Sequence, residues 1–350
     1  MTPQLEIATE GRLGVIALNR PEAINALSRE MIAGIAAQLS AWQADPAIRA
    51  VLFEGRGTRG FCSGGDVRAA RKLVLDGQPD EADAYFAEEY RMNAQIANYP
   101  KPVIALTDGI VMGGGIGIAG HARYRFTTQD AQYAMPEGAI GLVADVGVNW
   151  ILGKAPENRA LLFLLTGLPV KGADVLALGL ADCSIEAQRL AAVRASIVNA
   201  ANTGDVEPAL VALMQAESIQ SGERDMCDLA DELDEFLSAP TAAEIVEGIA
   251  EEAHEDAALA PYAAQLARLS PTTLEANVLA HRAARRLRNI EAVLDLDLRV
   301  VSFMARHPDF AEGVRAQLVD KDRQPNWQQR VDHGGLRAAV AGEKALAGVS

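Results

Sequence analysis

Residues Lys101–Ile118 read KPVIALTDGIVMGGGIGI. Within them Val103–Thr107 is apolar and partly β-branched, which predicts a buried strand, and a glycine cluster, Met112–Gly120, follows. Glycines let backbone N–H groups approach a ligand because no Cβ stands in the way. A helix that begins in the cluster would add its positive end to the field. The segment therefore predicts an oxyanion site beside a buried strand.

A second glycine segment, Gly60–Asp66 (GFCSGGD), follows another predicted strand at Ala50–Glu54. Similar apolar runs predict strands at Leu13–Asn19 and Tyr124–Thr128. Between the first two strands, apolar residues recur at helical spacing over 28–42, behind a serine that can cap the helix. The pattern predicts an α/β protein.

The glycines allow two other interpretations. They could serve only tight turns and close helix packing. Alternatively, Gly115, Gly117 and Gly120 match a GxGxxG dinucleotide fingerprint, with Glu137 as the acid for a ribose. Seven residues, 108–114, separate the strand from that motif, whereas a dinucleotide fold places its first glycine almost at the strand end, so this match is weak.

Two carboxylates lie in the Gly-rich, apolar stretch 134–147 (AMPEGAIGLVADVG), which contains no Lys or Arg to pair with them. Burial of Glu137 and Asp145 would raise a carboxyl pKa and suit these groups to acid and base chemistry on a substrate or a water. Each alone could also be a cap or turn residue. Ser63 and Cys62 are weaker candidates as nucleophiles, because the flanking pattern is not GxSxG and the nearest histidine, His121, is distant in sequence.

Charge and composition exclude several classes of function. The net charge of −15 disfavours a nucleic-acid partner, and no run of about 18 apolar residues predicts a membrane span. Three cysteines without a CxxC pair fit a reducing compartment, and the histidine spacing predicts no metal site. The N-terminal residues MTPQLEIATEGR lack a basic segment followed by an apolar run, so we expect a cytoplasmic protein.

From about residue 186 onward the strand signal fades and apolar residues recur at helical period, which predicts a helical second half. Prolines are expected to mark helix boundaries in this region, because the residue before a proline avoids the helical conformation. These prolines are Pro240, Pro261, Pro271 and Pro308.

Four ordered motifs resemble the crotonase (enoyl-CoA hydratase/isomerase) superfamily: LNRPEAINAL at 18–27, GFCSGGDVR at 60–68, the Lys101–Ile118 segment, and MPEGAIGL at 135–142. The resemblance implies a superhelix of repeated ββα units followed by a helical C-terminal region. The implied organisation is a catalytic acyl-CoA-binding core over 1–200, a helical region over 201–330 that covers the active site, and a tail over 331–350 that is partly disordered.

The same resemblance implies a set of site residues. The oxyanion hole would consist of the amides of Gly65 and Gly114, and Glu137 would be one acid of the site. Hydratases of the superfamily use a second glutamate at the position of Gly117, so the hydratase pair is broken here. Candidates for binding the substrate and its coenzyme A lie in the same motifs: Arg20, Ser63, Gly64, Asp66, Arg68 and Gly113, with Lys101 as a further candidate for the phosphates.

The remaining acid, Asp145, gives a Glu/Asp pair that resembles 3-hydroxyisobutyryl-CoA hydrolases and dienoyl-CoA isomerases. SPTT at 270–273 and residues 308–327 (PDFAEGVRAQLVDKDRQPNW) are similar to the C-terminal signature of the hydrolases. Two departures are Ala144, where the hydrolases commonly have Pro, and Val148, where they have a second Gly. The resemblance implies hydrolysis of 3-hydroxyisobutyryl-CoA, an ester of valine breakdown, with no cofactor apart from the coenzyme A of the substrate.

The alternatives at this point are an isomerase or hydratase of the same superfamily and a non-catalytic acyl-CoA-binding protein. The expected partner is an acyl-CoA ester, and self-association into a homo-oligomer stays open.

Overall fold

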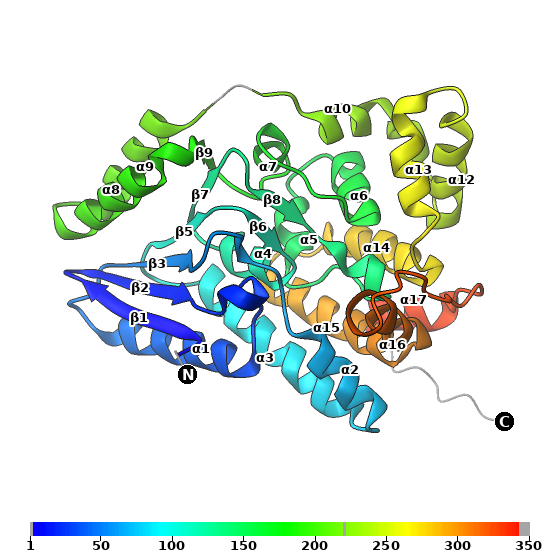
Figure 1. Ribbon diagram of the computed structural model, residues 1–350, viewed down its shortest axis with the longest axis horizontal. Coiled ribbons are helices and arrows are strands. Elements are labelled where there is room, and N and C mark those ends of the chain that lie inside the picture. Colours follow the sequence, from blue (N-terminus) through cyan, green and yellow to red (C-terminus); the bar gives the residue numbers. More distant parts are fainter. Residues whose placement is uncertain (1–2, 220–221, 343–350) are drawn as a thin grey trace. The chain divides into compact units, whose positions relative to one another are not determined.

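The computed structural model describes residues 3–219 and 222–342 (Figure 1). The chain forms two compact units, each assembled from three stretches of sequence. The first unit takes residues 1–66, 88–134 and 169–225, and the second takes residues 67–87, 135–168 and 226–350. The candidate oxyanion-hole glycines, Gly65 and Gly114, thus belong to the first unit, and both candidate acids belong to the second.

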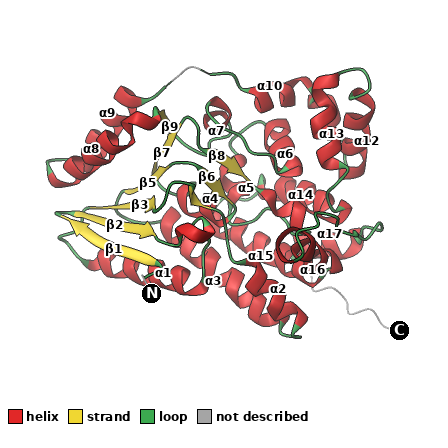
Figure 2. Cartoon of the chain, in the orientation of Figure 1, coloured by secondary structure: helices red, strands yellow, loops and turns green. Residues whose placement is uncertain are grey.

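The main sheet of the first unit has six strands in the order β1-β2-β3-β5-β7-β9 (Figure 2). Only β1 and β2 are antiparallel, and every other neighbouring pair is parallel. The four predicted strands are confirmed as β2, β3, β5 and β7, whereas β1 and β9 were not predicted. The strands are β1 (Leu5–Glu10), β2 (Leu13–Leu18), β3 (Ala50–Gly55), β5 (Val103–Thr107), β7 (Tyr124–Thr128) and β9 (Cys183–Ile185).

A second, parallel sheet of three short strands lies in the same unit, in the order β4-β6-β8. Its strands are β4 (Gly60–Cys62), β6 (Ile110–Met112) and β8 (Gln132–Ala134). Each follows a strand of the main sheet in the chain, so the pairs β3–β4, β5–β6 and β7–β8 repeat one pattern before the next helix. This repetition confirms the expected ββα superhelix. The strand directly before the Met112–Gly120 cluster is therefore β6, in the small sheet.

Helices cover the main sheet. One face of the sheet and helices α8 (Leu190–Asn202) and α9 (Val206–Glu217) form one buried apolar core. Helix α1 (Arg29–Ala44) packs against β2, and its predicted cap is confirmed because the Ser28 side chain accepts a hydrogen bond from the Met31 N–H. The other helices of this unit are η1 (Pro21–Ala23), α4 (Gly114–Ala119), α7 (Ala173–Ala177) and η3 (Ala187–Arg189).

The described residues of the second unit form helices and no strand. Helices α3 (Pro79–Ala97) and α10 (Asp225–Glu232) contribute residues to both units. The other helices are α2 (Val67–Leu75), η2 (Pro136–Ile140), α5 (Val148–Leu152), α6 (Glu157–Thr166), α11 (Asp234–Leu237), α12 (Ala242–Glu252), η4 (Ala257–Leu259), α13 (Ala260–Leu266), α14 (Pro271–Ala284), α15 (Ile290–Arg306), α16 (Pro308–Val314), the π-helical turn η5 (Arg315–Val319) and α17 (His333–Ala341).

The helical second half is confirmed, because no strand follows β9 in the described residues. Three of the marked prolines stand in the first turn of a helix, at 261, 271 and 308, and the fourth, Pro240, lies just before α12. The division at residues 200 and 330 stays a prediction. Helix α17 falls within the expected tail, and residues 343–350 lie outside the described residues.

Candidate active site

The two glycine segments meet in the first unit. A Cβ at Gly114 would lie 3.4 Å from the nitrogen of Gly65, and a Cβ at Gly64 would lie 3.6 Å from the nitrogen of Gly114. A Cβ at Gly115 would lie only 2.6 Å from the carbonyl oxygen of Cys62, which a real side chain could not do. The glycines therefore permit a close approach between the backbones of the two segments.

Backbone pairing orients one of the two amides. Leu27 forms a parallel bridge with Gly65, in which the Leu27 N–H donates to Gly64 O at 2.8 Å and the Asp66 N–H donates to Leu27 O at 3.0 Å. In such a bridge the N–H of the middle residue points away from the partner strand. Gly114 is the first residue of α4, and the first N–H groups of a helix have no acceptor within it. These two amides are therefore the candidates for binding an oxygen atom of a ligand.

A buried carboxylate lies beside these amides. Glu89 of α3 is 3% exposed, and its Oε1 lies 2.3 Å from the position that a Cβ at Gly114 would occupy. The Leu27 Cδ1 atom lies 3.1 Å from the same point. A side chain at position 114 would therefore displace the Glu89 carboxylate. Glu89 was not singled out from the sequence, because glutamates are frequent in α3 and nothing in their spacing distinguishes this one.

Most of the polar residues proposed for substrate binding have hydrogen bonds within their own unit. The Arg20 Nη1 atom donates to Ala26 O at 2.6 Å, and the Ser63 hydroxyl donates to Ala23 O at 3.0 Å. The Arg68 Nη2 atom, in the second unit, donates to Leu318 O at 2.8 Å. Lys101 donates to the carbonyl oxygens of residues 42 and 45, which end helix α1. Lys101 is therefore explained as a helix cap, and its role at the phosphates has no support in its contacts.

Cys62 is fully buried, and burial is the main cause that raises the pKa of its thiol to about 12. Its Sγ also contacts the carbonyl oxygen of Asn25 at 3.2 Å. A thiol that stays protonated is a poor nucleophile. Cys62 therefore packs as a small buried residue.

Glu137 and Asp145 lie close together in sequence in the second unit. Glu137 is in the 3-10 helix η2, and Asp145 is in the loop before α5. Their exposed fractions are 8% and 6%, which confirms the expected burial of both carboxylates. The turn after Asp145 contains two consecutive left-handed residues, Val146 (φ 53°) and Gly147 (φ 73°). A β-branched residue in this region costs on the order of 1–3 kcal/mol, so surrounding contacts must hold the turn.

Helix α16 packs directly on the backbone of η2. A Cβ at Gly313 would lie 2.4 Å from the carbonyl carbon of Ile140, and a Cβ at Gly141 would lie 2.3 Å from the carbonyl oxygen of Asp309. Gly141 also has a positive φ of 69°. The pair of glycines, 172 positions apart in sequence, sets the position of the turn that carries Glu137.

The two C-terminal signature segments bind one another. The Ser270 hydroxyl, at the start of α14, donates to Asp309 Oδ2 at 2.6 Å, and Asp309 Oδ1 accepts the Gln328 N–H at 2.9 Å. Ser270 also caps α14 by accepting the Thr273 N–H. Ser270 and Asp309 are at most 1% exposed. The signature thus joins α14 and α16 behind the η2 turn.

Two side chains from distant helices bind the loop around Asp145. Asn277 of α14 accepts the Ala144 N–H at 3.0 Å, and Asp297 of α15 accepts the Gly147 N–H at 2.8 Å. A proline at position 144 would have no N–H to donate to Asn277. Alanine at this position therefore allows a hydrogen bond that proline would not. Val148 is the first residue of helix α5, and its N–H donates to Asp145 O. A valine is therefore compatible with the backbone at this position.

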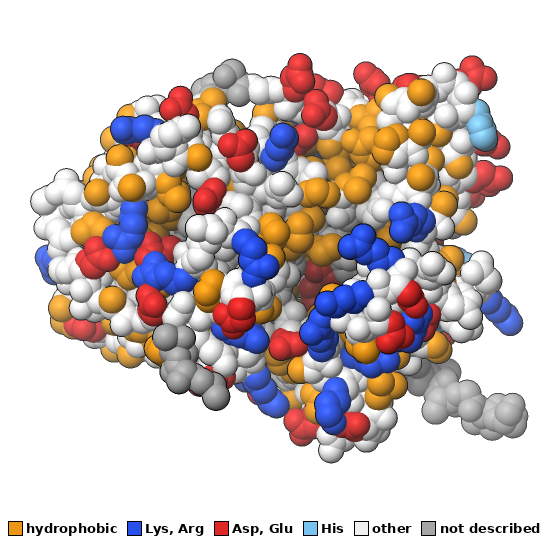
Figure 3. Space-filling model, viewed as in Figure 1, with side chains coloured by type: hydrophobic (Ala, Val, Ile, Leu, Met, Phe, Trp, Pro, Cys, Tyr) orange, Lys and Arg blue, Asp and Glu red, His pale blue; other side chains and the backbone are white. Residues whose placement is uncertain are grey.

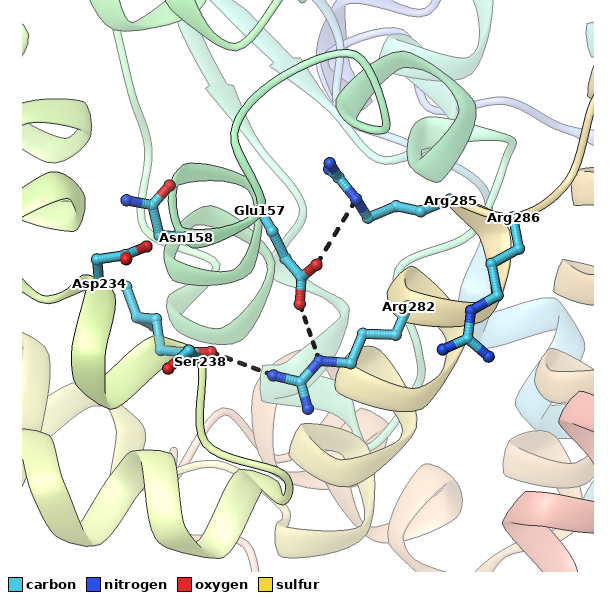
Figure 4. Close-up of a pocket in the computed structure, with 8 residues that line it drawn as sticks. Glu157, Asn158, Asp234, Ser238, Arg282, Arg285 and Arg286 are labelled. Carbon is cyan, nitrogen blue, oxygen red and sulfur yellow. Dashed lines mark hydrogen bonds and ion pairs between the residues drawn. The ribbon is translucent and has the colours of Figure 1, made fainter.

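The second unit also contains a pocket of about 520 Å³, which neither of these acids lines. Arg282, Arg285 and Arg286 are among the residues that line it (Figure 4). Arg282 binds Glu157 at 2.9 Å and three backbone carbonyls between residues 237 and 240. Arg285 binds Ala155 O and lies 3.6 Å from the Glu157 carboxylate. These arginines are at the C-terminal end of α14, where cations are favoured, and they connect helices.

The described residues contain no group of three or more His, Cys, Asp or Glu placed to hold a metal ion. Within the same residues, no helix is long and apolar enough to cross a membrane. On the face drawn in Figure 3, acidic and basic side chains are intermixed.

The chain matches the family model described as enoyl-CoA hydratase/isomerase over residues 13–333. It is 34% identical to the mitochondrial 3-hydroxyisobutyryl-CoA hydrolase of Gallus gallus over 328 residues, which cover 91% of this chain and 83% of the relative. It is 33% identical to the Homo sapiens protein of the same name over 323 residues, with 91% and 82% covered.

Two solved structures that are similar to this chain support the same family. A carnitinyl-CoA dehydratase from Mycobacterium thermoresistibile matches with a TM-score of 0.88 and 33% identity, covering 97% of this chain and 96% of its own. An enoyl-CoA hydratase from Rhodobacter sphaeroides matches with a TM-score of 0.87 and 31% identity, covering 97% of both chains. The protein belongs to the enoyl-CoA hydratase/isomerase family. The alternative of a dinucleotide-binding site is wrong, because the glycine cluster belongs to a chain with the fold of this family and not to a dinucleotide-binding fold.

Proposed function

We propose that the protein hydrolyses the thioester of a short β-hydroxyacyl-CoA, 3-hydroxyisobutyryl-CoA in the first place. The observation that carries the proposal is the identity of 33–34% over 91% of the chain to relatives named for this reaction. Retention of both acids and both glycines supports an active enzyme over a non-catalytic acyl-CoA-binding protein. A role in valine breakdown is part of the proposal.

In this reaction the amides of Gly65 and Gly114 donate hydrogen bonds to the thioester oxygen as it becomes negative. Each such donor, when preorganised, stabilises a transition state by about 3–4 kcal/mol. The acyl carbon then gains an oxygen by one of two routes. Water adds directly and gives its proton to Glu137, or the Glu137 carboxylate adds first and water then releases the acyl group from it. In both routes the carbon–sulfur bond breaks and the coenzyme A thiolate takes up a proton.

Asp145 has the second role in the proposal. It orients the hydroxyl of the substrate or assists the proton transfer to the leaving group. Glu137 has no second carboxylate at the hydratase position, because Gly117 in α4 has no side chain. This difference favours hydrolysis over the addition of water to a double bond.

The test measures release of free thiol from 3-hydroxyisobutyryl-CoA with a colorimetric reagent. Wild type, Glu137→Gln and Asp145→Asn are compared, with 3-hydroxypropionyl-CoA, acetyl-CoA and crotonyl-CoA as further esters. We expect turnover of the hydroxyacyl esters to fall at least about 100-fold in Glu137→Gln, because general bases contribute 10²–10⁴-fold. Circular dichroism and the Tm of each variant control for folding. Near-normal turnover in Glu137→Gln would refute the chemistry.

Hydration is the second candidate, because two similar solved structures are titled a carnitinyl-CoA dehydratase and an enoyl-CoA hydratase. Loss of the conjugated absorbance of crotonyl-CoA, without thiol release from any ester, would assign this activity instead. The cytoplasmic location and self-association stay predictions, which cell fractionation and size-exclusion chromatography test.

A further inference from the structure

A buried carboxylic acid stands directly behind the loop that carries Asp145. Asp297 is 1% exposed and lies on the apolar face of α15, between Val293 and Val300 at helical spacing. Its Oδ2 atom accepts the Gly147 N–H at 2.8 Å. Its Oδ1 atom is buried and has no hydrogen-bond partner among the described residues. A charged group is costly on a helix face that is otherwise core, so a specific use is expected.

Asp297 is connected to a second buried polar pair. The Asn149 side chain lies near enough to Asp297 to lower the pKa of its carboxyl group, and the Oδ1 atom of Asn149 lies 2.9 Å from Nδ1 of His281 on α14. Asn149 is 2% exposed and His281 is fully buried. If the His281 Nδ1 donates to the Asn149 oxygen, the amide nitrogen of Asn149 is left to donate to Asp297. The chain His281–Asn149–Asp297–Gly147 is therefore consistent in donors and acceptors.

The surroundings of Asp297 shift the pKa of its carboxyl group. Burial, and after it the negative charge of Asp145, raise the pKa of Asp297 well above its usual range. Burial also lowers the pKa of His281 to about 3, so this imidazole is neutral. The hydrogen bond from the Gly147 N–H, the Asn149 side chain and the positive charge of Arg299 act in the opposite direction on this pKa. Two neighbouring carboxylates cannot both be ionised at low cost, so Asp145 adds to the effect of burial.

The hydrogen bond from the Gly147 N–H to Asp297 lies at the strained part of the turn after Asp145. Gly147 is the second of the two left-handed residues after Asp145, and Val146 is the first. A turn of this kind persists only where its surroundings hold it. Asn277 binds the loop on the other side of Asp145, at the Ala144 N–H. The backbone on both sides of Asp145 is thus held by side chains of α14 and α15.

We propose that Asp297, supported by Asn149 and His281, is a positioning residue that holds the turn after Asp145 in its working conformation. The proposal rests on the proposed function in so far as Asp145 serves thioester hydrolysis. It extends that function to a residue 152 positions away in the sequence. This residue acts through the loop around Asp145 and does not contact the substrate.

Two substitutions separate positioning from charge. Asp297→Leu keeps a side chain branched at Cγ, although a larger one, but removes the acceptor for the Gly147 N–H, whereas Asp297→Asn keeps an acceptor oxygen at the same position. Asp295→Ala, on the exposed side of the same helix, is the matched control. We expect kcat to fall about 100-fold in Asp297→Leu with KM within about threefold, because misplacement by 1 Å can cost a factor of 10². Asp297→Asn should retain most of the turnover that Asp297→Leu loses.

A second measurement does not depend on activity. Hydrogen–deuterium exchange of the peptide that contains residues 142–150 should be faster in Asp297→Leu than in wild type and Asp295→Ala, and close to wild type in Asp297→Asn. If Asp297→Leu does not fold, Asn149→Ala removes the support of the carboxyl group and gives the same comparison. Wild-type exchange and kcat in Asp297→Leu would overturn the proposal, as would an equal loss of kcat in Asp297→Asn.

A double-mutant comparison links Asp297 to Asp145. If Asp297 acts through Asp145, the change at 297 should have little further effect on kcat in an Asp145→Asn background. Full additivity of the two losses would overturn that link. Undiminished turnover in Asp145→Asn alone would instead refute the role of Asp145 in the proposed function, while the exchange measurement would still decide whether Asp297 holds the turn.

Discussion

Replacing Gly313 by alanine should displace the turn that carries Glu137. The Cβ of an alanine at this position would lie 2.4 Å from the carbonyl carbon and 2.6 Å from the Cα of Ile140. An ordinary carbon contact is about 3.4 Å or longer, so α16 and η2 must separate by on the order of 1 Å. The opposing atoms belong to the backbone of a short helix, so no side-chain rotation can relieve the contact.

Two opposing effects set the change in stability. Alanine is favoured over glycine in a helix by about 1 kcal/mol. Extra volume in a well-packed interior costs about 1–3 kcal/mol, and an unyielding backbone contact belongs at the upper end of that range. We therefore expect Gly313→Ala to lose about 1–2 kcal/mol of the free energy of unfolding.

The effect on turnover should be larger than the effect on stability. Glu137 precedes Ile140 by one turn of the same 3-10 helix, so a shift of about 1 Å at Ile140 is carried to the carboxylate. A misplacement of this size can cost on the order of 100-fold in rate. The assay combines Tm by scanning calorimetry with kcat for thiol release from 3-hydroxyisobutyryl-CoA.

Gly334→Ala is the matched control for this variant. Gly334 lies in α17, and the nearest atom to its Cβ position is 3.6 Å away, which is an ordinary contact. This change should leave turnover intact and stabilise the protein by up to about 1 kcal/mol. Gly313→Ala with the Tm and kcat of wild type would refute the argument that α16 fixes the position of Glu137.

Two further predictions concern buried titratable groups. All three cysteines are buried and the pKa of Cys62 is raised to about 12, so the native protein should not react with a thiol reagent that detects three thiols after denaturation. Rapid labelling of the native protein would contradict this packing. Burial lowers the pKa of His281 to about 3, from 6.5, so the unfolded chain binds a proton that the folded protein rejects between these pH values. Stability should therefore be complete above about pH 6.5 and fall below it by up to about 1.4 kcal/mol per pH unit, and His281→Gln should show a shallower loss of Tm; an unchanged slope would refute the assignment.

The sequence predicted the long strands because their signal is local. Continuous apolar and β-branched runs such as Val103–Thr107 are typical of strands in a covered parallel sheet, and they have no competing interpretation of the same length. Strands of three residues, such as β4 and β6, are too short to show a period. β1 was missed because four of its six residues are exposed and it pairs only along one edge. Its sequence therefore lacks the apolar run that identified its neighbours.

The candidate site was predictable only in its local parts. The glycine segments and the two acids are contiguous motifs, and the structure brings Gly65 and Gly114 together as expected. Asn277 and Asp297 were missed because each acts on a loop more than 130 positions away. One signal could have indicated Asp297: it interrupts the apolar stripe of α15, where a carboxylate is costly.

These contacts give the C-terminal signature a physical role. The segment that carries both acids spans only about a dozen residues and contains strained backbone at Val146, so it cannot hold its own shape. Three helices from the second half of the chain hold it, through Gly313 on η2, Asn277 before Asp145 and Asp297 after it. A hydrogen bond from Ser270 to Asp309 in turn joins two of those helices. These C-terminal helices therefore position the segment that carries the acids, which gives a physical reason for the resemblance to the hydrolase relatives to extend over 91% of the chain.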